Sequence, residues 1–304
     1  MYYFKYSLLK VSNFVYCKFN KYKNFKNNFF YNYFHLLLII LIGSNHPNRF
    51  ELFMKKKDYL SIFKNINWKL NKKAKNIYIV LGDSHSELYG RNYKSNQDNN
   101  ASFITIWLGP ILLIKFLKSS FLLDRSIFLI NKIVNFFGKS KTYHVIFSFG
   151  EIDVRSSFFR MLEINRSYKN LDDLLNNYSK QIRKSIEKIK IKTGKKIYIN
   201  FYFKEPPPTT YKIGYLPKNR NEMIEIYQSE EFPVMGNLED RILWHSNLRK
   251  IILENSDLFL FLKNSKKSFD SNGALNKNIS DNIHITSTEI IEEFQNNLIN
   301  LKRN

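Results

Sequence analysis

The chain has 304 residues, and its one cysteine, Cys17, excludes an internal disulfide and a cysteine-based metal centre. Hydrophobic residues make up 44% of the sequence, which is too much for a disordered chain, and no apolar run reaches the roughly 18 residues typical of a membrane-spanning helix. The formal net charge is +22, from 48 Lys and Arg against 26 Asp and Glu, but no zinc-finger, RNP or helix-turn-helix motif accompanies it, so nucleic acid is not predicted as the main partner.

Residues 1–53 form a basic and aromatic extension ahead of the domain predicted at 54–304. Much of the positive charge lies in residues 1–77, so any membrane contact is expected there. The apolar stretch within 29–43 fits a signal or anchor segment, although no small-residue cleavage site follows it. Equally, Met54 is followed by three lysines and fits a true protein start. The localisation stays open between export and the cytoplasm, with a lean toward the cytoplasm.

From residue 75 onward, strand patterns alternate with helix patterns. Runs of β-branched and aromatic residues predict buried strands at 76–81, 143–149, 196–203 and 257–262. Apolar periodicity predicts one or two helices at 110–137, and further helices at 171–193, 238–255 and 286–302. This order predicts an α/β domain with a parallel sheet and helices on both faces. Ligands of such sheets bind beyond the carboxyl ends of the strands.

Two short motifs at the ends of this domain carry residues suited to nucleophilic chemistry. Gly82-Asp83-Ser84 follows the first strand, where a serine would be exposed on a strand-to-helix turn beside backbone N–H donors. Asp281 and His284 precede the last helix, and a serine nucleophile needs a base that a carboxylate orients. The alternatives are an ordinary helix cap for the first motif and a solvated loop for the second.

Together, these motifs resemble those of the SGNH (GDSL-type) hydrolases. The resemblance implies a three-layer α/β/α sandwich with a flavodoxin-like parallel sheet. It also implies that Ser84 is the nucleophile, His284 the base and Asp281 the residue that orients it. The family's second motif is a glycine that donates to the oxyanion, and Phe103–Pro110 matches it, so that role falls to Gly109; the alternative for Gly109 is a simple turn.

The third motif departs from the family pattern. Where the family has Gly-x-Asn-Asp, this chain has Gly150-Glu151-Ile152-Asp153, and the isoleucine cannot donate a hydrogen bond. Losing one oxyanion donor typically costs about 2.7–4 kcal/mol of transition-state stabilisation. Arg155 is the candidate replacement or substrate clamp, held by Glu151 or Asp153. The alternative is that Glu151, Asp153 and Arg155 form a structural ion-pair cluster.

The resemblance leads to a predicted serine esterase that acts on small acyl esters, such as acetyl groups on glycans. His85 follows the nucleophile and is a candidate substrate-binding residue, and the string Asp83-Ser84-His85 also resembles that of SGNH-like O-acetyltransferases. Transfer of the acyl group to a polysaccharide and non-catalytic binding are therefore the alternatives. No cofactor or metal is predicted. Arg241 and His245 are interpreted as residues of a solvated helix face.

Overall fold

The structure is a computed structural model that describes residues 74–89, 100–108, 111–193, 198–230, 232–280, 284–285 and 287–300. The extension at 1–53, the signal or anchor segment at 29–43 and the start at Met54 lie outside the described residues, as do Gly109 and Asp281. Within the described residues, no helix is both long and apolar enough to cross a membrane.

The core of the molecule is a five-stranded sheet in which every pair of neighbours is parallel. Its strands are β1 (Asn76–Gly82), β2 (Ala101–Trp107), β3 (Thr142–Ser148), β4 (Ile199–Lys204) and β5 (Leu260–Leu262). They lie in the order β2-β1-β3-β4-β5. This is the doubly wound order of flavodoxin-like folds, so the predicted fold class is confirmed.

The interior strand β1 is buried on both faces of the sheet. Ile77, Ile79 and Leu81 belong to the larger hydrophobic core, whereas Tyr78 and Val80 belong to a second core on the opposite face. Successive side chains of a strand point to opposite faces, so a strand covered on both sides has to be apolar throughout. This is why the uninterrupted apolar run at 76–81 predicts its position.

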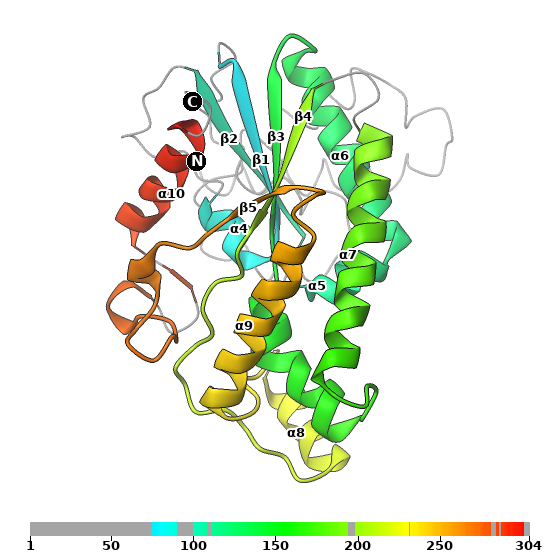
Figure 1. The fold of residues 1–304 in the computed structure, drawn as a ribbon, viewed down its shortest axis with the longest axis vertical. Coiled ribbons are helices and arrows are strands. Elements are labelled where there is room, and N and C mark those ends of the chain that lie inside the picture. Colours follow the sequence, from blue (N-terminus) through cyan, green and yellow to red (C-terminus); the bar gives the residue numbers. More distant parts are fainter. Residues whose placement is uncertain are drawn as a thin grey trace, which may run out of the picture.

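Helices cover both faces of the sheet (Figure 1). The larger core includes residues of α5 (Leu113–Lys118), α6 (Ser120–Phe137), α7 (Leu171–Thr193) and α9 (Leu238–Glu254). The second core includes residues of α4 (Ser84–Tyr89) and α10 (Thr288–Asn300). One further helix, α8 (Arg220–Ser229), lies at the lower end of the molecule in Figure 1. The predicted three-layer arrangement is therefore observed.

Most predicted elements are found within two or three residues of their predicted ends, and the exceptions have physical causes. The range 110–137 contains two helices, α5 and α6, because the chain breaks at Ser119, which caps α6 by accepting from the N–H of Leu122. Strand β5 begins at Leu260, later than predicted, because residues 255–258 form a turn in which Leu258 N–H donates to Asn255 O. Helix α8 was not predicted, since Met223 is its one buried residue.

Candidate functional site at the carboxyl edge of the sheet

Gly82 ends β1 at a point where a side chain has no room. A Cβ atom there would lie 1.9 Å from the carbonyl oxygen of Ser148 at the end of β3. The Gly82 carbonyl accepts from the N–H of Leu108, and Asp83 N–H donates to Ser148 O at 3.3 Å. The ends of β1, β2 and β3 are thus tied together where the Gly82-Asp83-Ser84 motif begins. The predicted oxyanion donor, Gly109, directly follows Leu108.

Asp83 is buried and sets the start of α4. Its Oδ1 accepts from the backbone N–H of His85 at 3.0 Å, and its carbonyl accepts from the Ser86 hydroxyl at 2.6 Å. These are the contacts of a helix cap, so the cap interpretation holds for Asp83. Ser84 is the first residue of α4, and its side chain lies outside the described ones.

The structure brings the first and last motifs together through their two histidines. The His85 ring is buried and its Nδ1 lies 3.3 Å from Asp83 Oδ1. The ring centroids of His85 and His284 are 4.8 Å apart, with the planes tilted by 44°. His284 is therefore packed against the residue that follows Ser84, although 199 positions separate the two histidines in the chain. The sequence alone did not predict contact between the two rings.

A short loop presents His284. Ser280 and Ile285 form an isolated antiparallel bridge, and Ser287 N–H donates to Ile279 O at 3.3 Å. These contacts fix the backbone on both sides of His284. Asp281 is outside the described residues, so its role as the partner of His284 stays a prediction.

The third motif begins at Gly150, two residues after the end of β3. The φ of Gly150 is 110°, which lies in the region that favours glycine. A Cβ atom at Gly150 would meet Pro206 at 3.0 Å. Ile152 is 2% exposed and belongs to the larger core, and its side chain has no hydrogen-bond donor. The position that carries the oxyanion asparagine in the family is here a packing position.

Asp153 contacts helices rather than Arg155. Its carboxylate accepts from the N–H groups of Leu113 at 2.6 Å and Ile114 at 3.2 Å, and from the Tyr178 hydroxyl at 2.5 Å. It thus caps α5 from 40 positions away, where the residue preceding the helix makes no side-chain cap. Complete burial raises the pKa of Asp153 to about 7, against the opposing effect of these hydrogen bonds.

Arg155 is held by Glu151, as one of the two predicted arrangements requires. Its Nε donates to Glu151 Oε1 at 2.8 Å, and its guanidinium also donates to the Phe232 carbonyl. The Arg155 carbonyl accepts from Met235 N–H at 2.8 Å. Both members of the pair are buried, with Arg155 6% exposed. These contacts favour the structural interpretation of the cluster, in which Arg155 fixes the loop around residues 232–235.

Arg241 and His245 are buried, so their interpretation as solvated residues is wrong. Arg241 is fully covered and donates to the carbonyls of residues 210, 212, 235 and 236. His245 Nε2 lies 2.9 Å from Pro206 O. Burial lowers the pKa of both side chains, that of Arg241 to about 10. Both residues contact the loop that leaves β4, which contains three consecutive prolines, 206–208, and packs on Gly150.

Across the described residues, no group of three or more His, Cys, Asp or Glu is placed to hold a metal ion.

Comparison with known proteins gives similarity in structure rather than in sequence. No protein-family model and no curated protein matches the chain. Among solved structures, the chain is similar to a GDSL-like lipase from Bacteroides thetaiotaomicron, at 16% identity and a TM-score of 0.37, over 76% of this chain and 87% of the lipase. It is also similar to a lipase from a goat rumen metagenome, at 13% identity and a TM-score of 0.37, over 73% and 96% of the two chains. Such similarity identifies no substrate, and the function has to be argued from the site.

Proposed function

We propose that the chain is a serine esterase of the SGNH type that acts through an acyl-enzyme. The observation that carries the proposal is the packing of His284 on His85, one residue from Ser84, beyond the carboxyl end of β1. Open parallel sheets bind their ligands at this edge. Acyl transfer by this mechanism requires a serine, a histidine and a carboxylate, and the proposal assigns these roles to Ser84, His284 and Asp281.

In the proposed reaction, Ser84 Oγ attacks the ester carbonyl while His284 takes the hydroxyl proton. The tetrahedral intermediate collapses, His284 returns the proton to the leaving alcohol, and the acyl group stays on Ser84. Water, activated by His284, then releases the carboxylic acid. Asp281 orients His284 and stabilises its charged form. The backbone N–H groups of Ser84 and Gly109 donate hydrogen bonds to the oxyanion.

Small acyl esters, such as acetyl groups on glycans, are the proposed substrates. The core position of Ile152 leaves this oxyanion hole without the family's side-chain donor, and a missing donor lowers turnover by about 10²–10³-fold. We therefore expect slow hydrolysis of simple esters. The same acyl-enzyme would serve an O-acyltransferase if a sugar hydroxyl replaced water.

Covalent labelling tests the nucleophile directly. Intact mass after treatment of the full chain with a fluorophosphonate should show one adduct, and Ser84→Ala should abolish it. Ser86→Ala is the matched control, because Ser86 lies on the same helix but its hydroxyl is committed to the Asp83 carbonyl at 2.6 Å. Ser86→Ala should keep the adduct. Absence of labelling on folded protein would refute the serine mechanism and favour non-catalytic glycan binding.

A second experiment separates hydrolysis from transfer. With p-nitrophenyl acetate as donor, a hydrolase releases acetate at a rate that does not depend on added oligosaccharide. A transferase instead yields an acetylated sugar, with little acetate when the acceptor is present. Either activity should disappear in Ser84→Ala.

A further inference from the structure

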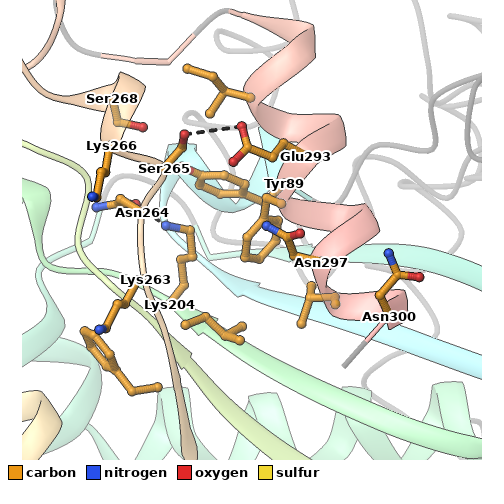
Figure 2. Close-up of a pocket in the computed structure, with 15 residues that line it drawn as sticks. Tyr89, Lys204, Lys263, Asn264, Ser265, Lys266, Ser268, Glu293, Asn297 and Asn300 are labelled. Atoms are coloured by element: carbon orange, nitrogen blue, oxygen red, sulfur yellow. Dashed lines mark hydrogen bonds between the residues drawn. The ribbon is translucent and has the colours of Figure 1, made fainter. Parts of the chain in front are cut away.

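A pocket of about 540 Å³ opens beside β5, between the segment that follows this strand and α10 (Figure 2). Its volume is in the range of pockets that hold small organic ligands. Its described lining includes neither His85 nor His284, so it is separate from the histidine pair of the proposed acyl site.

A buried lysine forms the floor of the pocket. Lys204, the last residue of β4, is 1% exposed, and its Nζ lies 5.0 Å from the ring centroid of Tyr89 and 5.4 Å from that of Phe294. The Nζ donates to Asn264 Oδ1 and, at 3.5 Å, to the backbone carbonyl of Glu205. An ammonium group has three hydrogen-bond donors. In a desolvated environment, an ammonium group without a paired carboxylate attracts an anion strongly.

The carboxylate of the adjacent residue, Glu205, already has two other partners. Glu205 Oε1 lies 2.7 Å from Arg249 Nε, and Glu205 Oε2 accepts from the Asn264 N–H at 2.6 Å. Desolvation lowers the pKa of Lys204 to about 7, although Glu205 opposes the shift. A bound anion would favour the charged form of Lys204.

The rim adds positive charge. Lys263 and Lys266 are exposed and line the pocket, and neither pairs with an acid in the part of the chain that the structure describes. Glu293 is the single acidic residue of the described lining, and it accepts from the Ser265 hydroxyl at 3.3 Å. The lysines therefore outnumber the carboxylates around the cavity.

The remaining polar groups suit hydroxyls rather than a second charge. Ser268 is 1% exposed, its Oγ has no hydrogen-bond partner among the described residues, and Figure 2 shows it directed toward the pocket. A buried hydroxyl without a hydrogen-bond partner destabilises the protein, and a ligand that hydrogen-bonds to it removes this penalty. The exposed amides of Asn297 and Asn300 line the opposite side, on α10.

We propose that this pocket is a second ligand site, for a small anionic carbohydrate that carries a phosphoryl or carboxylate group. Lys204 and the two rim lysines bind the anionic group. Ser268 and the asparagine amides of α10 bind the sugar hydroxyls. The proposal is independent of acyl chemistry, and Ser84→Ala should bind the same ligands as the wild type.

Isothermal titration calorimetry of the full chain with four probes tests the proposal. Glucose 6-phosphate or glucuronate should bind, glucose should bind at least tenfold more weakly, and inorganic phosphate should bind more weakly than glucose 6-phosphate. The better of the two charged sugars distinguishes a phosphoryl from a carboxylate ligand. The proposal is overturned if neither charged sugar binds, or if glucose binds equally well. Equal binding of phosphate and glucose 6-phosphate would overturn the carbohydrate part.

Variants then locate the binding. Lys204→Met keeps the length of the buried stem and removes the charge, and it should weaken binding by about tenfold or more. The double variant Lys263→Ser with Lys266→Ser changes exposed residues only, and it should weaken binding several-fold even if Lys204→Met fails to fold. Lys184→Ser, on the exposed surface of α7, is the matched control and should bind like the wild type. Wild-type affinity in the folded rim variant would refute the assigned location.

Discussion

Asp153 makes a prediction about stability and pH that can be worked through quantitatively. Its carboxyl group is completely buried, and burial raises its pKa from 3.8 to about 7. Between these two values, native Asp153 holds a proton that the unfolded chain has released. The free energy of unfolding therefore falls as the pH rises through this window, and the loss is complete above pH 7. About three pH units at 1.36 kcal/mol each give about 4 kcal/mol as the full effect.

Asp153→Asn removes this titration and keeps one acceptor oxygen for the two N–H groups of α5, which in the wild type donate to different carboxylate oxygens. The quantity to measure is the difference in free energy of unfolding between variant and wild type, from urea titrations between pH 4 and 8.5. Other buried titratable groups, such as Lys204 and His245, are present in both proteins and largely cancel. The difference should shift in favour of the variant by up to about 4 kcal/mol between pH 4 and 7, and then stay constant.

Asp172→Asn is the matched control, because Asp172 is an exposed acid in the first turn of α7. Its stability curve should run nearly parallel to that of the wild type. A constant difference for Asp153→Asn would refute the assignment of burial as the dominant effect. A shift against the variant as the pH rises would show that the three hydrogen bonds of the carboxylate outweigh its desolvation.

Two further predictions concern the sheet edge. Gly82→Ala should lower the free energy of unfolding by roughly 3 kcal/mol or more, because the added Cβ would overlap the backbone of Ser148. Gly138→Ala is the control: no atom lies within 4 Å of its added Cβ, and only its φ of 91° is unfavourable. It should lose about 1–2 kcal/mol in the same urea titration. Ile152→Asn restores the family's residue at that position, but it should destabilise the protein by about 2–3 kcal/mol without raising p-nitrophenyl acetate turnover, since the amide would face the core; a faster variant would refute this placement of Ile152.

The sequence predicts the fold well where packing follows directly from apolar pattern. β1 is covered on both faces and reads as one apolar run, and α7 buries an apolar stripe along most of its length. α8 and the π-helical turns Asp153–Ser157 and Arg160–Ile164 were not predicted. α8 buries little, and the π-helical turns depend on distant contacts such as the carboxylate of Asp153 at the start of α5. No local pattern encodes either.

Helix α9 shows how burial of a charge was missed. The buried face contains Arg241, Trp244, His245, Leu248 and Ile252, whereas Leu243 is 54% exposed. The spacing of three and four residues was visible in the sequence, but a charged residue within it suggested a solvated face. Arg241 is buried because loop carbonyls surround it, and those carbonyls are fixed only in the folded chain. The burial of Arg241 could have been predicted from its position on the apolar face of the helix, but not from its charge.

The third motif and the loops beneath it form one support for the sheet edge. Asp153 holds the start of α5, Arg155 with Glu151 holds the loop at 232–235, and Arg241 joins that loop to residues 210 and 212. A side chain that already satisfies several buried groups is costly to turn toward a substrate. The polar residues of this motif therefore hold the edge in place, and reactivity is left to the proposed Ser84 and His284. In this arrangement, substitutions in the support should lower activity through stability and the position of the edge, rather than through loss of a group that contacts the acyl carbon.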